Sequence, residues 1–255
     1  MGRIHSVFRT SFNISCGEFL VHVGTTESPL SCLGFNIDPG RMEGILPSVR
    51  PGDRAVFRSG TLRIYDQDKV SAVSYGKMET VDLRVHASDN LPDVALYQAL
   101  APMVCPDRIG ITLDSAAWRA IDGLRSNCGN ENALQEAIAF LLGRGKGLTP
   151  SGDDILMGFG AGLLAWSDPE PLRLALRRTL RQQTTDISVA YLRAMLDGYV
   201  NEDYMTLFNA VRVGQKENYE KLVEQISCHG HTSGCDSLLG LMTAIETLPA
   251  SCRPA

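Results

Sequence analysis

A glycine-rich segment carries residue types that suit the binding of a small anion. It covers residues 143–158 and reads GRGKGLTPSGDDILMG. Ser151, with Asp154 three residues later and Pro150 directly before it, forms the capping-box pattern that starts a helix. Backbone N–H groups at a helix start attract anions, and the helix dipole adds partial positive charge. The segment therefore predicts an anion site, to which Lys146 would add a full charge.

The spacing of this segment excludes two well-known phosphate-binding loops. The second glycine, the lysine and the serine or threonine do not stand at the distances that a P-loop requires. A helical pattern precedes the segment, whereas a dinucleotide-binding fingerprint follows a strand. The predicted site is therefore a general anion site at a helix start.

A second segment repeats the first. Residues 151–158 and 233–240 share the pattern S-G-x-D-x-L-x-G, so each copy predicts a capping box and a glycine two turns into its helix. Small residues let helices approach closely, and they form a ridge in each copy. The ridges are Gly158, Ala161, Gly162 and Ala165 in the first helix, and Gly240 and Ala244 in the second. Crossing there would bring both helix starts to one place, and the repeat suggests a duplication.

Three carboxylates and a histidine gather near the two predicted helix starts. Asp153, Asp154 and Asp236 are more acids than two caps need, which favours a functional site. His231 stands two residues before Ser233, and its ordinary pKa near neutrality suits proton transfer. The alternative is structural: two well-capped helices that pack tightly, with His231 as a cap residue.

A third segment, residues 184–191, presents hydroxyl groups. Thr184, Ser188 and Tyr191 stand at i, i+4 and i+7, on one face of a predicted helix. Hydroxyls can hydrogen-bond to oxyanions and amides, so this face is a candidate wall of the same site. The alternative is that Thr184 or Thr185 only caps the helix.

Composition narrows the class of protein. The 255 residues carry a net charge of −5, which argues against nucleic-acid binding, because phosphates require a basic face. Seven scattered cysteines are expected to be reduced thiols. The first residues contain no apolar core of a secretory signal, and the longest apolar run, about 12 residues, is too short to span a bilayer. We therefore expect a cytoplasmic protein without a membrane segment.

Hydrophobic periodicity changes along the chain. Short alternating runs up to residue 85, including 19–23, 55–64 and 81–85, predict strands, with a hairpin turn at Ser59-Gly60. Spacings of three and four then predict helices. These fall after a cap at 114–115, before Gly143, and at 151–166, 170–182, 185–198, 203–212, 216–227 and 234–247. The expected fold is α+β, with a small β-barrel or sandwich over 1–90 and a mainly helical domain over 91–255.

The three segments together resemble a known bacterial family. The stretches GKGLTPSGDDILMG, TTDISVAYL and HGHTSGCDSLLG match it in order over roughly residues 143–245. This family, formerly of unknown function, includes the subunit of oxamate carbamoyltransferase encoded with the allantoin-utilisation genes. The resemblance implies a subunit of a heteromeric enzyme that exchanges a carbamoyl group between oxamate and phosphate in purine-nitrogen catabolism. It implies other subunits as partners.

The resemblance and the residue chemistry agree on a small anionic substrate such as carbamoyl phosphate or oxamate. Backbone N–H groups at the two helix starts would bind its phosphate or carboxylate, Lys146 would neutralise developing charge, and His231 would carry the proton. The candidate catalytic residues are His231, Lys146, Asp153, Asp154 and Asp236. The candidate substrate-binding residues are Gly147, Thr149, Ser151, Gly152, Thr184, Thr185, Ser188, Thr232, Ser233 and Gly234.

Other functions stay open at this point. No cofactor is required, although Mg²⁺ between the carboxylates and a phosphate is an alternative. The same three aspartates would serve a metal-dependent hydrolase or phosphoryl-transfer enzyme. A non-catalytic ligand-binding or scaffold subunit, alone as a homodimer or within a larger assembly, is the third interpretation. A zinc site at residues 228–235 is not predicted, because the cysteine and histidine spacing is not that of a zinc knuckle.

Overall fold

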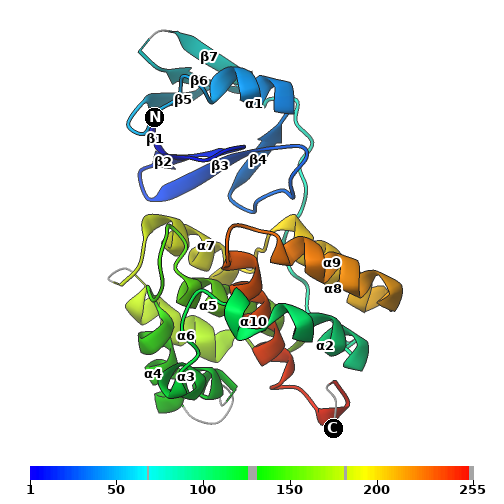
Figure 1. The fold of residues 1–255 in the computed structure, drawn as a ribbon. Coiled ribbons are helices and arrows are strands. Elements are labelled where there is room, and N and C mark those ends of the chain that lie inside the picture. The colour runs from blue at the N-terminus through cyan, green and yellow to red at the C-terminus, as the bar shows by residue number, and fades with distance from the viewer. Residues whose placement is uncertain (68, 126–130, 181–182, 253–255) are drawn as a thin grey trace. The chain divides into compact units, whose positions relative to one another are not determined.

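The computed structural model describes residues 1–67, 69–125, 131–180 and 183–252. Cys128 and the last two residues of the predicted helix 170–182 lie outside this part. The chain forms two compact units, Met1–Leu83 and Arg84–Ala255, each described here by itself (Figure 1). The first holds a seven-stranded sheet and the second holds helices, which confirms the predicted α+β class. The six described cysteines are free thiols.

The first unit is a single curled sheet, a half-barrel, with one helix. Its strands run in the order β4-β3-β2-β1-β5-β6-β7, and only the β3–β4 pair is parallel. The elements are β1 Gly2–Val7, β2 Phe12–Cys16, β3 Phe19–Thr25, β4 Gly34–Ile37, α1 Pro39–Ile45, β5 Arg54–Arg58, β6 Thr61–Tyr65 and β7 Val70–Ser74. Alternating residues such as Phe12 and Ile14, or Leu62 and Ile64, are buried on one face.

The predicted hairpin is present and one predicted strand is not. Ser59 and Gly60 take positive φ angles of 49° and 71°, the backbone that a two-residue hairpin turn requires. The alternating run 81–85 forms no strand. Only Arg84 makes an isolated bridge, to Tyr199, and the Val85 N–H donates to the Gly198 carbonyl at 2.8 Å. Alternation alone does not make a strand when the only neighbour is a short segment after a helix.

The second unit is helical, as predicted. Its main helices are α2 Val94–Leu100, α3 Ser115–Arg125, α4 Glu131–Leu141, α5 Ser151–Trp166, α6 Glu170–Thr179, α7 Asp186–Leu196, α8 Glu202–Val213, α9 Tyr219–Ser227 and α10 Ser233–Ile245. Short 3₁₀ turns lie at Ala101–Met103, Pro106–Arg108, Lys216–Asn218 and Ala250–Cys252. None of the described helices is long and apolar enough to cross a membrane.

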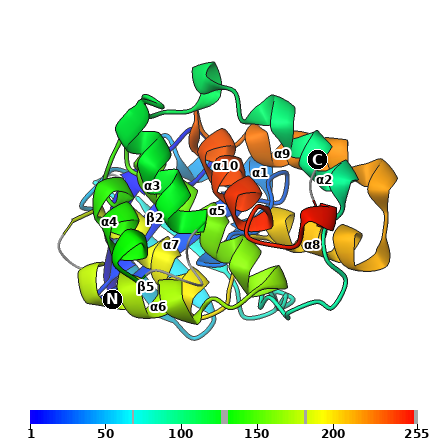
Figure 2. The ribbon, with the colours of Figure 1, turned by 90° about the horizontal axis from the view of Figure 1, so that it is seen from below.

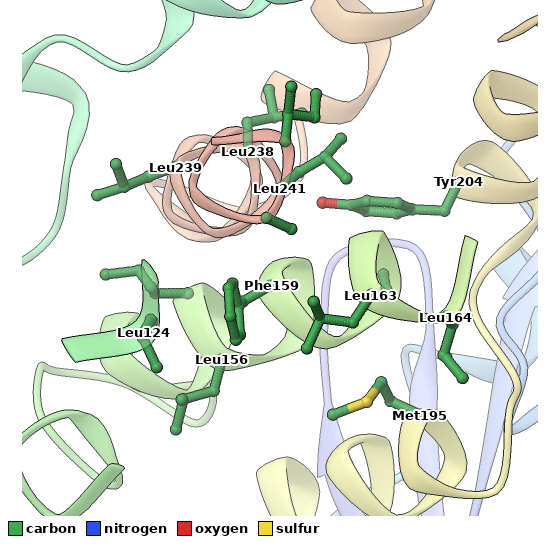
Figure 3. Packing of buried hydrophobic residues seen from close by; sticks show 14 of the residues in the cluster. Leu124, Leu156, Phe159, Leu163, Leu164, Met195, Tyr204, Leu238, Leu239 and Leu241 are labelled. Carbon is green, nitrogen blue, oxygen red and sulfur yellow. The ribbon is translucent and has the colours of Figure 1, made fainter. Parts of the chain in front are cut away.

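Helix α5 is the centre of this unit. It is buried almost all round, the pattern of a helix inside a core rather than on a surface. It crosses α10, beside the neighbouring pair α3 and α4 (Figure 2). Figure 3 shows α5, with the labelled side chains of Phe159 and Leu163, between α10 and Met195 of α7. The repeated segments therefore begin the two most central helices.

Candidate functional site

The two repeated helices touch through their glycines. A Cβ atom added at Gly158 would lie 1.7 Å from the Ser237 carbonyl oxygen, and one at Gly240 would lie 1.9 Å from that of Ile155. Each glycine is the seventh residue after its serine, and each meets the fourth residue after the other serine, so the contact is reciprocal. One turn further, a Cβ at Gly162 would lie 2.5 Å from the Ala244 Cβ. The predicted close approach of the small residues is confirmed.

The close approach brings the two helix starts together. Thr149 Oγ1 and Ser233 Oγ form a hydrogen bond of 3.0 Å across the repeat. The Asp154 carboxyl interacts with the hydroxyls of Ser233 and Thr149. In the same way, the Asp236 carboxyl interacts with those of Ser151 and Thr232. Each aspartate therefore pairs with the serine of the opposite copy.

This crossed pairing corrects the predicted capping boxes. The N-cap residues are Pro150 and Thr232, and neither side chain caps its helix. Helix α5 begins at Ser151, as predicted, and α10 begins at Ser233, one residue earlier than predicted, so each serine is the first helical residue. A serine inside the first turn is poorly placed to accept from the N–H groups of its own helix, so its hydroxyl turns to the neighbouring helix instead.

The loops before the two helices already use part of the predicted N–H donors. Gly152 N–H donates to the Arg144 carbonyl at 2.8 Å, and Gly234 N–H donates to the His229 carbonyl at 3.0 Å. In the described part of the chain, the N–H groups of Ser151 and Ser233 have no hydrogen-bond acceptor. The donors that remain to bind an anion at each helix start are therefore the serine N–H and the surrounding hydroxyls.

The third segment joins this cluster through Asp153 and the glycine-rich loop. The Asp153 carboxyl accepts from Gly143 N–H at 2.7 Å and from the Thr184 hydroxyl. Thr185 Oγ1 donates to the Leu148 carbonyl at 2.5 Å and accepts from Ser188 N–H at 3.1 Å, which caps α7. The three sequence segments thus meet. Thr184 precedes the helix, so the predicted helical face of Thr184, Ser188 and Tyr191 is wrong at its first member.

Burial shifts the ionisation of the acids in this cluster. It raises the pKa of Asp153 and of Asp236, against the opposing effect of the N–H and hydroxyl donors around them. It raises the pKa of Asp154 well above its ordinary value, and the charges of Asp236 and Asp153 act in the same direction. Burial and the neighbouring acids therefore act together on Asp154, whereas hydrogen-bond donors partly offset burial at Asp153 and Asp236.

Several polar atoms in the cluster lack partners. Within the described residues, Asp154 Oδ2 and Asp236 Oδ2 are buried and accept no hydrogen bond, and the buried Ser188 hydroxyl has only its interaction with the Asp153 carboxyl. Asp236 is fully buried and Ser188 is almost so. Buried polar atoms are usually satisfied, and exceptions often mark a place where a water or ligand binds. The unsatisfied atoms therefore point to an incomplete site.

Two residues in the site were missed by the sequence reasoning. Gly110 N–H donates to Asp236 Oδ1 at 2.8 Å, and its Cα lies so close that an added Cβ would stand 2.1 Å from Ser151 Oγ. Tyr204 Oη donates to Ser237 Oγ at 2.9 Å, which in turn donates to the Gly234 carbonyl at 2.9 Å. Burial raises the pKa of Tyr204 far above its ordinary value. A single glycine in a loop and a tyrosine at an apolar helix position give no sequence signal.

The two candidate ionic catalysts lie on the exposed loops. Lys146 is exposed between Gly145 and Gly147, both of which have positive φ angles, before α5. His231 is exposed before α10. The neighbouring His229 differs from His231 in that it contacts an acid: its Nδ1 lies 3.2 Å from Oδ2 of the buried Asp203.

Neither a metal-binding group nor the surface cavity coincides with the cluster among the described residues. Across the described ranges, no group of three or more His, Cys, Asp or Glu side chains is arranged to hold a metal ion. A surface cavity of about 500 Å³ is lined by residues 89–91, 93, 211–214, 216 and 219, and none of the predicted site residues lines it. Its Lys216 already forms an ion pair of 2.5 Å with Asp93. The convergence of the three segments remains the better guide to the site.

The comparison with known families supports the same region. Residues 141–245 match the family described as oxamate carbamoyltransferase subunit AllH. This matched region is less than half of the 255 residues, and the similarity to the family holds for that region. The match contains every candidate site residue predicted from the sequence, and Tyr204, whereas Gly110 lies before it. No solved structure matches the chain. A family of enzyme subunits implies that its members work with other subunits.

Proposed function

We propose that the chain is the subunit of an oxamate carbamoyltransferase that binds a small anionic substrate, such as oxamate or carbamoyl phosphate, at the paired starts of α5 and α10. The proposal places this enzyme in the degradation of allantoin and related purine nitrogen, in the cytoplasm. The observation that carries it is the reciprocal crossing that gathers hydroxyls, carboxyls and two helix N-termini within the family-matched region.

The chemistry of the cluster suits an anion with an attached amide. The N–H groups of Ser151 and Ser233 and the positive ends of two helix dipoles favour a phosphate or carboxylate. Hydroxyls such as Thr149 and Thr232 add donors. Lys146, on its glycine-flanked loop, would bring the only full positive charge proposed for the site. It would stabilise negative charge that develops as the carbamoyl group is transferred.

Binding is tested with the purified full-length chain by isothermal titration calorimetry with oxamate, carbamoyl phosphate and phosphate, with and without Mg²⁺. We expect binding without metal. Lys146→Ala should weaken binding of carbamoyl phosphate by about 1–3 kcal/mol, the scale of a charge-assisted hydrogen bond. Lys221→Ala, an exposed lysine on α9, is the matched control and should bind as the wild type does. Binding that appears only with Mg²⁺ would favour the metal-dependent hydrolase.

Proton transfer is tested in the enzyme assembled with its other subunits. His231→Ala should lower turnover by roughly 10²- to 10⁴-fold and leave oxamate affinity nearly unchanged, the behaviour of a lost general acid–base. His86→Ala, which changes a histidine before the matched region, is the control. Full turnover by the His231→Ala enzyme would assign the proton transfer elsewhere. Absence of ligand binding by a chain that supports full turnover would make it a scaffold subunit.

A further inference from the structure

The repeat divides the cluster into two half-sites with the same parts. The first half-site consists of the Asp154 carboxyl with the hydroxyls of Thr149 and Ser233. The second consists of the Asp236 carboxyl with the hydroxyls of Thr232 and Ser151. Because the aspartates and serines occupy equivalent positions of the two copies, the half-sites can be compared group by group.

The second half-site is filled by a peptide group of the chain itself. Gly110 N–H donates to Asp236 Oδ1 at 2.8 Å. A Cβ added at Gly110 would lie 2.1 Å from Ser151 Oγ and 2.5 Å from Thr232 Oγ1, so the Gly110 backbone sits directly against both hydroxyls. The second half-site therefore shows what this set of groups holds: an amide, with its N–H on the carboxyl and its neighbouring atoms against the hydroxyls.

The first half-site has no such occupant. Among the described residues no backbone N–H donates to the Asp154 carboxyl, and its Oδ2 is buried without a partner. In the described part of the chain, the groups that hydrogen-bond with this carboxyl are the hydroxyls of Ser233 and Thr149. Asp236 Oδ2 is also buried without a partner, so the two half-sites differ in the Gly110 N–H that donates to Asp236 Oδ1. A carboxyl removed from water without N–H donors is costly, and the first half-site lacks the amide that the second one has.

We propose that the amide nitrogen of the substrate occupies the first half-site, where its N–H donates to Asp154 as Gly110 N–H donates to Asp236. This inference rests on the proposed function and adds which end of the substrate is recognised there. It selects a small molecule with a primary amide or carbamoyl group next to an anionic group. The carboxylate or phosphate then lies toward the Thr149 and Ser233 hydroxyls, as the atoms flanking the Gly110 N–H lie against Thr232 and Ser151.

The inference is tested with two probes that differ only at the proposed contact. Oxamate and pyruvate both have a carbonyl group next to a carboxylate, but oxamate has an amide NH₂ where pyruvate has a methyl group. Calorimetry of the full-length chain should give an oxamate affinity about 10- to 100-fold higher than that of pyruvate, the scale of a hydrogen bond to a charged group. In Asp154→Ala the preference should fall to within about twofold, since no acceptor remains.

Two further variants make the result specific. Asp154→Asn keeps one acceptor oxygen and should retain part of the preference, which also provides the measurement if the alanine variant does not fold. Glu220→Gln removes the same charge from an exposed position on α9 and should keep the full preference. Equal binding of oxamate and pyruvate by the wild type, or an unchanged preference in both Asp154 variants, overturns the inference alone. Absence of binding of either probe overturns the proposed function and the inference with it.

Discussion

The two copies of the repeat share the same helix crossing but differ in the groups that their aspartates contact. Both begin a central helix and contribute one glycine to the crossing and one aspartate to the cluster. They differ at the third position, where Asp153 ties the glycine-rich loop to the third segment, whereas Cys235 lies buried with its Sγ 3.9 Å from the Ser227 carbonyl. The equivalent aspartates Asp154 and Asp236 differ again, because Asp236 receives the backbone N–H of Gly110, whereas among the described residues no backbone N–H donates to Asp154.

This difference distinguishes the residues that hold α5 and α10 together from the residues of the candidate site. The glycine crossing needs both copies to be alike, since each glycine meets the backbone of the other helix. Ligand binding needs them to be unlike, since a half-site closed by Gly110 cannot also hold a substrate. The following experiments ask where the two copies remain equivalent and where they have diverged.

The largest effect is expected at the crossing. Gly158→Ala and Gly240→Ala each place a methyl group within 2 Å of a backbone carbonyl of the other helix. Backbone cannot yield as a side chain does, so each variant should lose more than about 3 kcal/mol in free energy of unfolding, measured by urea denaturation. If the two glycines contribute equally to the crossing, the two losses in free energy of unfolding should be similar.

Gly160→Ala is the matched control for these variants. It lies in the same helix, but its added Cβ would meet the Met195 side chain, at 2.3 Å from Sδ. A flexible methionine can move aside, so the loss should be clearly smaller than at the two crossing glycines. Equal losses at Gly158 and Gly160 would show that the helices separate easily and that the crossing does not hold the starts together.

A smaller effect is expected from the crossed serine–aspartate pairs. Ser151→Ala and Asp236→Asn should be coupled by about 1 kcal/mol in a double-mutant cycle of unfolding free energies, because the hydroxyl and carboxyl interact directly. Ser233→Ala and Asp154→Asn should be coupled to a similar extent. Coupling between Ser151 and Asp154 of the same helix, with none between the two copies, would contradict the crossed pairing and support the predicted capping box.

Local sequence patterns predicted most of the crossing of α5 and α10, and only part of the candidate site. The bounds of α5, the glycine crossing and the meeting of three segments follow from periodicity and from the repeat itself. The prediction of capping boxes was wrong because a serine hydroxyl can hydrogen-bond either to its own helix or to a neighbouring helix. The packing of the two helices determines which bond forms. Gly110 could not be found, because its role arises from a contact 126 residues away in the sequence. The run 81–85 alternates but has no sheet beside it.

The smallest expected effect concerns pH and Asp154, whose Oδ2 atom is buried. Burial raises the pKa of this carboxyl in the folded chain above the ordinary 3.8, so the folded state holds the proton more tightly than the unfolded state does. By linkage, the free energy of unfolding has its full contribution from this group below pH 3.8 and loses it as the pH rises through the raised folded value. Asp153 and Asp236 contribute with the same sign.

Asp154→Asn removes one of these three titrations and leaves a neutral side chain of the same shape. The variant should therefore gain stability relative to the wild type as the pH is raised from below 3.8 toward neutrality, measured by urea denaturation at both ends of that range. Glu220→Gln, an exposed acid on α9, should show no such pH-dependent gain. Because Asp236 already receives the Gly110 N–H, Asp236→Asn should gain less than Asp154→Asn does. Equal gains would mean that the two half-sites are occupied alike, and a constant difference for Asp154→Asn at all pH values would place its carboxyl in water.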